Sequence, residues 1–253
     1  NQQNQDIGEV GLIGNTSYSN GTYTIQASGI HIYDTADEFH FVYEPMEGDG
    51  EIIAHVDSLI NTSSWAKAGV IIRETLSDDS KNVLMMITGS NGSSFQTRIE
   101  TSGYSFDTTP YDGIATPYWI RLVRSGNTFT GYKSVDGVNW VLVGSENVAM
   151  NSSVYVGLAV TANNDSSLTT AVIDNMSVVS NSPSPTPTPL PTNDFLIINS
   201  TLPGYEAIYK AEPDGTNWLK LAGDGSGSWK HAGYPRVSPD GQFVAYEAHN
   251  GPR

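Results

Sequence analysis

Carboxylate pairs are the first residues in this sequence whose spacing would suit acid–base chemistry. Asp49 and Glu51 are separated by one residue, and Asp37 and Glu38 are adjacent. Retaining glycosidic cleavage needs two carboxyl groups about 5 Å apart, a separation that alternate residues of one strand provide. Asp49 and Glu51 are predicted to lie in a turn, and Asp37 and Glu38 would point to opposite faces of a strand. We therefore expect no catalytic pair and no enzyme activity.

Nucleophilic and transition-metal chemistry have no signature in the sequence either. The chain has no cysteine and no Gly-x-Ser-x-Gly elbow, and nothing links any of its 5 histidines to both a serine and an acid. No His-x-x-x-His pair or His/Asp cluster indicates zinc or iron.

Binding is better supported, because polar side chains share one parity of several expected strands. If Phe39, Ala54, Val70 and Phe95 point into the core, the opposite face carries His40, His55, Asp57, Lys67, Arg73, Gln96, Arg98 and Glu100. Sugars are held by planar polar groups and by stacking on an aromatic ring. The predicted ligand-binding residues are His55, Arg73 and Arg98, with Trp65 as the stacking ring. The alternative is a solvated sheet face with cross-strand ion pairs.

The elements that must position these residues are strands, because apolar residues recur with period two. Expected strands include 39–43, 52–57, 67–73, 83–88, 95–100, 118–124, 128–133, 140–143, 154–161 and 170–179. Asp136-Gly137 favours a type I′ hairpin turn, and Trp119 and Trp140 are expected in the core. With no amphipathic helix in view, the sequence predicts an all-β fold of two antiparallel sheets packed face to face.

Several segments also carry a resemblance to one bacterial module. They are Asp6–Gly14, Tyr18–Thr24, Thr35–Tyr43, Trp65–Glu74, Trp119–Tyr132, Ser134–Trp140 and Ile173–Val178. Residues 6–179 thus resemble the concanavalin A-like, laminin G-like jelly rolls of secreted bacterial proteins, including glycoside hydrolases. Enzymes of that superfamily typically carry Glu-x-Asp-x-x-Glu on one strand, and Asp49-Gly-Glu51 lacks the third acid. The superfamily also contains lectin-like modules and spacers, so the resemblance predicts the fold and leaves the function open.

The resemblance further implies a structural calcium site, since superfamily members often bind calcium near strand ends. Asp34, Asp37 and Asp174, together with Asn175, are the candidate oxygen ligands. Ordinary turns use the same residue types, and nothing in the sequence requires a cofactor.

Asparagine sequons are the candidate modification sites. Of 8 Asn-x-Ser/Thr sequons, those in expected turns are Asn15, Asn20, Asn61, Asn91, Asn151 and Asn164, where a glycan would project from the surface. The alternative is that the sequons are unmodified.

Charge and hydropathy exclude several partners. The chain carries a net charge of −15, and residues 1–181 hold 7 basic and 20 acidic side chains. Such a surface repels phosphate, so nucleic acid and anionic membranes are not expected partners. No apolar run approaches the ~20 residues of a membrane span. The polar start at Asn1 suits a processed N-terminus, and we expect an extracellular or cell-surface location.

Alternating prolines at residues 181–193 predict an extended linker between a sandwich at 1–180 and a second region at 194–253. Residues 206–247 resemble a TolB-type β-propeller repeat on the strength of Asp214-Gly215 and Ser238-Pro-Asp-Gly241. Only one repeat and the opening strand of a second are present, and one blade cannot bury its own faces. The expected partner is therefore another protein chain or missing propeller blades.

These observations together predict a non-catalytic extracellular binding module, tethered to propeller-type sequence, whose partner is a polysaccharide or cell-surface glycan. One alternative is a structural, glycosylated subunit of a surface layer or extracellular fibre. Another is the accessory end of a propeller hydrolase.

Overall fold

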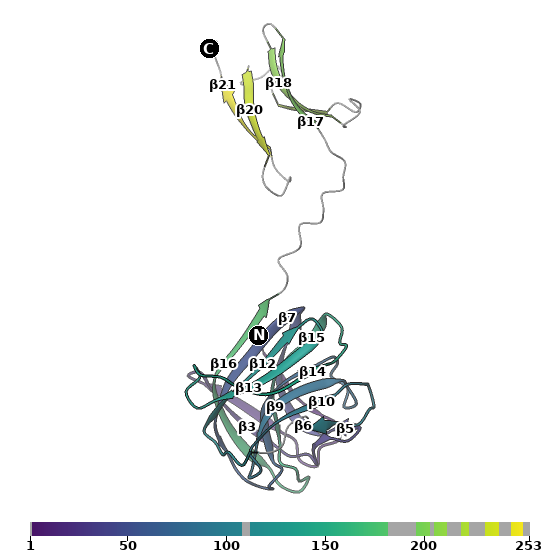
Figure 1. The fold of residues 1–253 in the computed structure, drawn as a ribbon, viewed down its shortest axis with the longest axis vertical. Coiled ribbons are helices and arrows are strands. Elements are labelled where there is room, and N and C mark those ends of the chain that lie inside the picture. The colour runs from purple at the N-terminus through teal and green to yellow at the C-terminus, as the bar shows by residue number, and fades with distance from the viewer. Residues whose placement is uncertain are drawn as a thin grey trace. The chain divides into compact units, whose positions relative to one another are not determined.

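The computed structural model of the chain describes residues 2–107 and 112–181, and the backbone of five strands between residues 196 and 249. Contacts divide the chain into two compact units, residues 1–183 and 184–253. Of the predicted linker, all residues after Asn181 lie outside the described part. The first unit is built from two stacked sheets (Figure 1), which confirms the predicted antiparallel β-sandwich of jelly-roll type.

Sheet A has seven strands, and every neighbouring pair is antiparallel. In spatial order they are β1 (Gln3–Ile7), β6 (Phe39–Glu47), β15 (Ser153–Thr161), β8 (Lys67–Arg73), β9 (Asn82–Thr88), β10 (Ser93–Arg98) and β11 (Phe106–Asp107). Sheet A therefore joins strands from the beginning, the middle and the end of this unit.

Sheet B also has seven strands, again with antiparallel neighbours. Their order is β14 (Val141–Asn147), β13 (Thr128–Ser134), β12 (Tyr118–Ser125), β7 (Asp49–Leu59), β16 (Thr169–Asn181), β3 (Thr22–Ala27) and β2 (Asn15–Ser19). The predicted two-residue hairpin turn at Asp136-Gly137 is wrong, because β13 and β14 are joined by residues 135–140. Asp136 organises this loop by accepting hydrogen bonds from the backbone nitrogens of Val138 and Asn139 at 2.9 and 2.8 Å.

The main core lies between the two sheets. Val70 and Leu158 from sheet A and Ile52 and Ile173 from sheet B are fully buried there. These positions alternate with outward-facing residues, as the period of a strand requires. Burial of this apolar surface is the main favourable term for the fold.

A second cluster covers the outer face of sheet A. It contains Ile7, Ile32, Phe39, Phe41, Tyr43, Ile71, Leu84, Met86 and Ala159. Ile32 belongs to a hairpin formed by β4 (Ile32–Tyr33) and β5 (Ala36–Asp37), which packs onto this face. Every residue of β8, β9 and β10 is consequently buried.

This second cluster corrects two expectations. Phe39 does not mark the inner face, because it belongs to the outer cluster while Val42 points into the main core. The outer face of sheet A is also not a solvated surface with exposed ion pairs, since the β4–β5 hairpin and neighbouring loops cover it. Hydrophobicity on both faces of a strand hides the alternation on which the parity argument depended.

The second unit contains two small antiparallel sheets. One joins β17 (Leu196–Leu202), β18 (Tyr205–Ala211) and β19 (Leu219–Ala222), and the other joins β20 (His231–Val237) and β21 (Val244–His249). The turns at Asp214-Gly215 and Asp240-Gly241 lie outside the described residues, so the resemblance to a propeller repeat stays a prediction.

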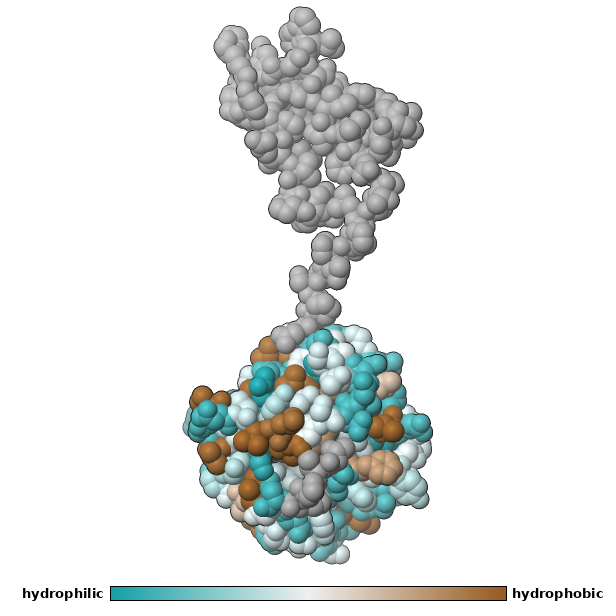
Figure 2. Space-filling view, viewed as in Figure 1, coloured by the Kyte–Doolittle hydropathy of each residue, from teal (hydrophilic) through white to brown (hydrophobic). Residues whose placement is uncertain are grey.

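Polar and apolar side chains are interspersed on the visible surface of the first unit (Figure 2). Within the described part of the chain, no helix is long and apolar enough to span a membrane.

Candidate ligand-binding site

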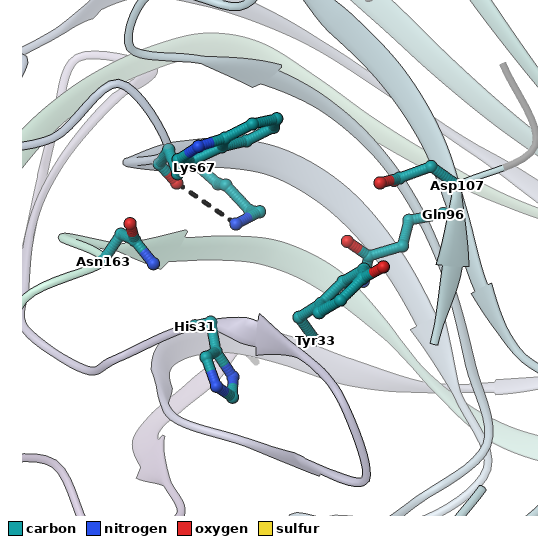
Figure 3. A pocket seen from close by; sticks show the side chains of 7 residues that line it. His31, Tyr33, Lys67, Gln96, Asp107 and Asn163 are labelled. Atoms are coloured by element: carbon teal, nitrogen blue, oxygen red, sulfur yellow. Dashed lines mark hydrogen bonds between the residues drawn. The ribbon is translucent and has the colours of Figure 1, made fainter. Parts of the chain in front are cut away.

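A cavity of about 320 Å³ opens on the outer side of sheet A, beside the β4–β5 hairpin. Its lining residues come from five separate segments, and they are His31, Tyr33, Trp65, Lys67, Gln96, Asp107 and Asn163. In Figure 3, Lys67 lies across the cavity from His31 and Tyr33, with Gln96 and Asp107 on a third side. The cavity is within the size range of small-ligand sites.

Two aromatic rings give the cavity an apolar surface that remains accessible. Tyr33, in β4, is 38% exposed, and Trp65, just before β8, is 39% exposed. Large aromatic side chains are usually more buried than this. Their exposure at the same cavity provides faces on which a flat apolar surface of a ligand can stack.

Among the described residues, Lys67 is the one lysine that lines the cavity, and the residue is only 4% exposed. Its Nζ donates a hydrogen bond to the backbone oxygen of Trp65 at 3.1 Å and lies 5.9 Å from the centre of the Trp65 ring. Burial lowers the pKa of Lys67 to about 8, and the nearby carboxylates of Asp107 and Asp37 oppose this shift.

Two buried polar atoms of the lining have no hydrogen-bond partner among the described residues. They are Nδ1 of His31 and Oε1 of Gln96. Gln96 is held in place by its own amide, which donates to the backbone oxygen of Ile32 at 2.7 Å. Buried polar groups are nearly always satisfied, so unpaired atoms beside a cavity are natural contacts for a ligand or for water.

Asn163 lies in the loop after β15 and forms another side of the cavity. Its amide nitrogen donates to the backbone oxygen of Ile30, and its amide oxygen accepts from Ser63 at 2.9 Å. Asn163 has a φ of 52°, a left-handed conformation that asparagine tolerates better than most residues. The two hydrogen bonds fix the loop against its neighbours, so this part of the lining is preformed.

A buried cluster of charges lies on the same face of sheet A. The Asp37 carboxylate accepts hydrogen bonds from Arg98 at 2.6 and 2.8 Å and lies 3.5 Å from Nη1 of Arg73. Arg73 also stacks over Phe39 at 5.2 Å, and all these charged groups are fully buried. Arg98 further binds the backbone oxygens of Tyr33 and Asp34 at 3.1 Å. The cluster therefore anchors the hairpin that forms one wall of the cavity.

The structure brings together only part of the predicted ligand set. Trp65 lines the cavity, whereas Arg73 and Arg98 lie on the same face of sheet A but are completely buried. His55 is on the outer face of sheet B, where it contacts Asp174 at 2.8 Å and the Trp119 ring at 5.0 Å. It cannot share a site with the others.

Other lining residues were found or missed for identifiable reasons. Lys67 and Gln96 were on the polar parity of the sequence pattern. His31, Tyr33 and Asn163 sit in short or irregular segments that have no periodic pattern. The sequence signals were the turn-type run Asn163-Asn164-Asp165 and the polar, aromatic composition of residues 31–34.

The three calcium candidates are not grouped. Asp37 is bound to Arg98, Asp34 lies 3.6 Å from His31, and Asp174 pairs with His55 on sheet B. Among the residues with described side chains, no group of three or more His, Cys, Asp or Glu is arranged to hold a metal ion.

The carboxylate pair at Asp49 and Glu51 was expected in a turn, but both residues lie in β7. Each already has a partner: Glu51 accepts a hydrogen bond from Nε of Arg121 at 3.0 Å, and Asp49 accepts one from the backbone nitrogen of Gly126 at 2.6 Å.

The expected core positions of Trp119 and Trp140 are also wrong, because both residues are half-buried and lie outside the two apolar clusters. Trp140 instead lies over Arg121 at 5.8 Å.

The candidate sequon asparagines are mostly accessible. Asn15, Asn20, Asn61, Asn151 and Asn164 are exposed, and Asn91 is half-buried. The amide of Asn91 donates to the backbone oxygen of Ser64 at 2.9 Å, so a glycan there would have to break this bond. Their modification stays a prediction.

No protein-family model and no curated protein matches the sequence. Solved structures do resemble the chain. A functionally unknown protein from Saccharomyces cerevisiae has a TM-score of 0.54 and 16% identity, covering 66% of this chain and 91% of that one. The carbohydrate-binding module CBM66 from Bacillus subtilis has a TM-score of 0.46 and 18% identity, covering 70% and 95%. A GH43 protein from Bacillus licheniformis has a TM-score of 0.48 and 13% identity, covering 70% of this chain and 39% of that one. The likeness to the first of these structures, at 16% identity, concerns the fold alone.

Proposed function

We propose that the first unit is a non-catalytic, extracellular glycan-binding module and that the cavity beside the β4–β5 hairpin is its binding site. The observation that carries the proposal is the combination of two exposed aromatic rings, Tyr33 and Trp65, with unpaired buried polar atoms in one cavity. A sugar ring has this mixed character, with an apolar C–H face and a rim of hydroxyl groups.

The polar atoms of the lining suit hydroxyl groups in particular. A hydroxyl donates one hydrogen bond and accepts others, so it can donate to Oε1 of Gln96 and accept from Nζ of Lys67. Lys67 uses one of its three donors on Trp65 among the described residues. Each ligand bond to a charged group contributes about 1.5–3 kcal/mol, and each neutral bond about 0.5–1.5 kcal/mol.

The proposal that the module is non-catalytic is supported by the engagement of its carboxylates. The closely spaced pair Asp49 and Glu51 is held by Gly126 and Arg121, on the outer side of sheet B rather than at the cavity. Asp107 is the one carboxylate among the described residues that line the cavity, and its Oδ1 accepts a hydrogen bond from Ser94 at 3.1 Å. A single carboxylate lacks the second group that glycosidic cleavage uses.

The test is glycan-array screening of the full chain, followed by titration calorimetry with any glycan that binds. Trp65→Ala and Tyr33→Ala should each weaken binding at least tenfold, about 1.4 kcal/mol. Tyr104→Ala is the matched control, because Tyr104 is 65% exposed and does not line the cavity.

Equal affinities for all three variants would move the site elsewhere, provided that their thermal unfolding matches that of the unmodified chain. Prolonged incubation with the bound glycan should release no new reducing ends; their release would contradict the non-catalytic assignment.

A structural role in a surface layer or fibre is the second candidate. The observation that favours it is the outermost strand of sheet B, β14, where Val141 and Leu142 are 57% and 59% exposed. Unpaired edge strands readily accept a strand from another chain. Light scattering over a concentration series should then show assembly that Leu142→Lys abolishes, whereas a concentration-independent monomer would exclude this role.

A further inference from the structure

Lys67 differs from the other lysines with described side chains in how its amine is held. Lys81 pairs with Glu74 and donates to the backbone oxygen of Ala149, and Lys133 pairs with Asp112. Lys67 makes no ion pair within 4 Å among the described residues and has one hydrogen bond, to the backbone oxygen of Trp65. Its amine is therefore the least committed of the three.

Of these three lysines, Lys67 is the one that lines the cavity, where a small molecule can reach its amine. Its Nζ points into the open space between His31, Tyr33 and Asn163 (Figure 3). The rest of the side chain is buried, because the residue as a whole is only 4% exposed. A ligand in the cavity would approach the amine from one direction, with the stem fixed behind it.

The charges around Lys67 are nearly balanced. Asp107 faces it from β11, and His31 with its partner Asp34 lies on the hairpin side. Deeper on the same face, Asp37 is matched by Arg98 and Arg73. Because desolvation exceeds the pull of the two carboxylates, burial lowers the pKa of Lys67 to about 8, and a substantial fraction of the amine is neutral at mildly alkaline pH.

We propose that Lys67 is an amine nucleophile that forms an imine with carbonyl-bearing molecules that enter the cavity. The chemical class is small aldehydes, including the open-chain aldehyde at the reducing end of a saccharide. The saccharide case rests on the proposed function, whereas the reaction with small aldehydes rests on the cavity alone.

The reaction balances without another reagent. The neutral Nζ forms a bond to the carbonyl carbon, the C=O electron pair moves to oxygen, and a proton passes from nitrogen to that oxygen. The resulting hydroxyl leaves as water with one more proton while the C=N bond forms. Amine and aldehyde thus give imine and water. His31 and Asp107 are the groups of the lining able to exchange protons with the reacting centre.

The experiment uses the full chain with glycolaldehyde and sodium cyanoborohydride, which reduces an imine to a stable secondary amine. Peptide mass spectrometry then measures the modification rate at each lysine. At pH 8, Lys67 should react at least tenfold faster than Lys81 and Lys133, which serve as internal controls. From pH 10 to pH 8 its rate should fall only about twofold, against more than tenfold for an ordinary lysine.

Lys67→Arg should lose the fast modification and leave the rates at Lys81 and Lys133 unchanged. If this variant does not fold, the comparison among lysines within the unmodified chain still decides. Equal rates at the three lysines, or an unmodified Lys67, would overturn the proposal.

A second arm separates this proposal from glycan binding. A glycan that binds on the array is compared with its borohydride-reduced form, which has no aldehyde. If both bind equally and Lys67 is not trapped, the proposed function stands and the imine does not form. If glycolaldehyde is trapped at Lys67 but no glycan binds, the amine chemistry stands and the proposed function fails.

Discussion

At the scale of single residues, the buried amine of Lys67 makes the free energy of unfolding depend on pH in the alkaline range. Burial lowers the pKa of Lys67 to about 8, from an ordinary value of 10.5. Between these two values the unfolded chain binds a proton that the folded chain does not, so stability rises with pH across this window. The penalty of burying the charged form is complete below pH 8.

Lys67→Met removes this penalty. We expect the free energy of unfolding of the variant, relative to the unmodified chain, to fall by about 3 kcal/mol between pH 7 and pH 11. Urea unfolding at both pH values measures the change, and Lys81→Met, at an ion-paired lysine, is the control. A difference that stays constant with pH would show that the amine is well solvated.

Asp112 makes the stability of the fold depend on pH in the acid range. Burial raises its pKa, but hydrogen bonds from Lys133 and Ser93 outweigh burial and lower the pKa to about 2. The stabilisation is present above the ordinary value of 3.8 and is lost as the pH falls toward 2. Asp112→Asn should therefore flatten the acid decline in melting temperature between pH 4 and pH 2. Asp165→Asn, at a half-buried loop residue, is the control, and an unchanged acid profile of Asp112→Asn would contradict this reading.

At the scale of elements, the β4–β5 hairpin depends on one arginine from sheet A. Arg98 holds Asp37 and the backbone oxygens of Tyr33 and Asp34 in a fully buried site. Arg98→Met would leave the Asp37 charge buried with Arg73 at 3.5 Å and one hydrogen bond from the Asn82 amide at 3.1 Å, and breaking such a buried pair typically costs about 3–5 kcal/mol. Hydrogen exchange should also become faster in residues 31–37.

The matched control is Arg121→Met, since the Arg121–Glu51 pair is partly exposed and pairs of that kind contribute about 1 kcal/mol or less. Equal losses of unfolding free energy for the two variants, measured by urea denaturation, would mean that the hairpin is not anchored through Arg98.

The strands also show which parts of the fold could be predicted from the sequence. Alternation of polar and apolar residues predicted most strands of both sheets, and in sheet B it matches the alternating burial along β7 and β12. It failed on the outer face of sheet A: Phe39 and Phe41 are as apolar as the inner residues, so their direction was not readable. The β4–β5 strands have two residues each, too few for any period. The cavity depends on that hairpin, and His31 and Tyr33 were therefore missed.

At the scale of the whole molecule, the two compact units should unfold separately. A fragment of residues 1–183 contains both seven-stranded sheets and their core, so its calorimetric transition should match the main transition of the full chain. In a fragment of residues 184–253, the described strands form a three-stranded and a two-stranded sheet, and sheets this small are marginal alone in water. This fragment should show no cooperative transition. A cooperative transition from the second fragment, or a shift of the first by more than a few degrees, would indicate interdependence.

The position of β15 and β16 has a consequence for how the protein is made. β15 is inserted between β6 and β8, and β16 between β7 and β3, although both are synthesised after all of those neighbours. Until residues 153–181 have left the ribosome, each sheet is split into two parts, and β6, β8, β7 and β3 each have one unpaired edge. Unpaired strand edges and apolar surface make nascent chains prone to aggregate. A chaperone that shields the growing chain would be needed most during the synthesis of residues 83–153, and a stop codon in that interval would yield insoluble product rather than a smaller domain.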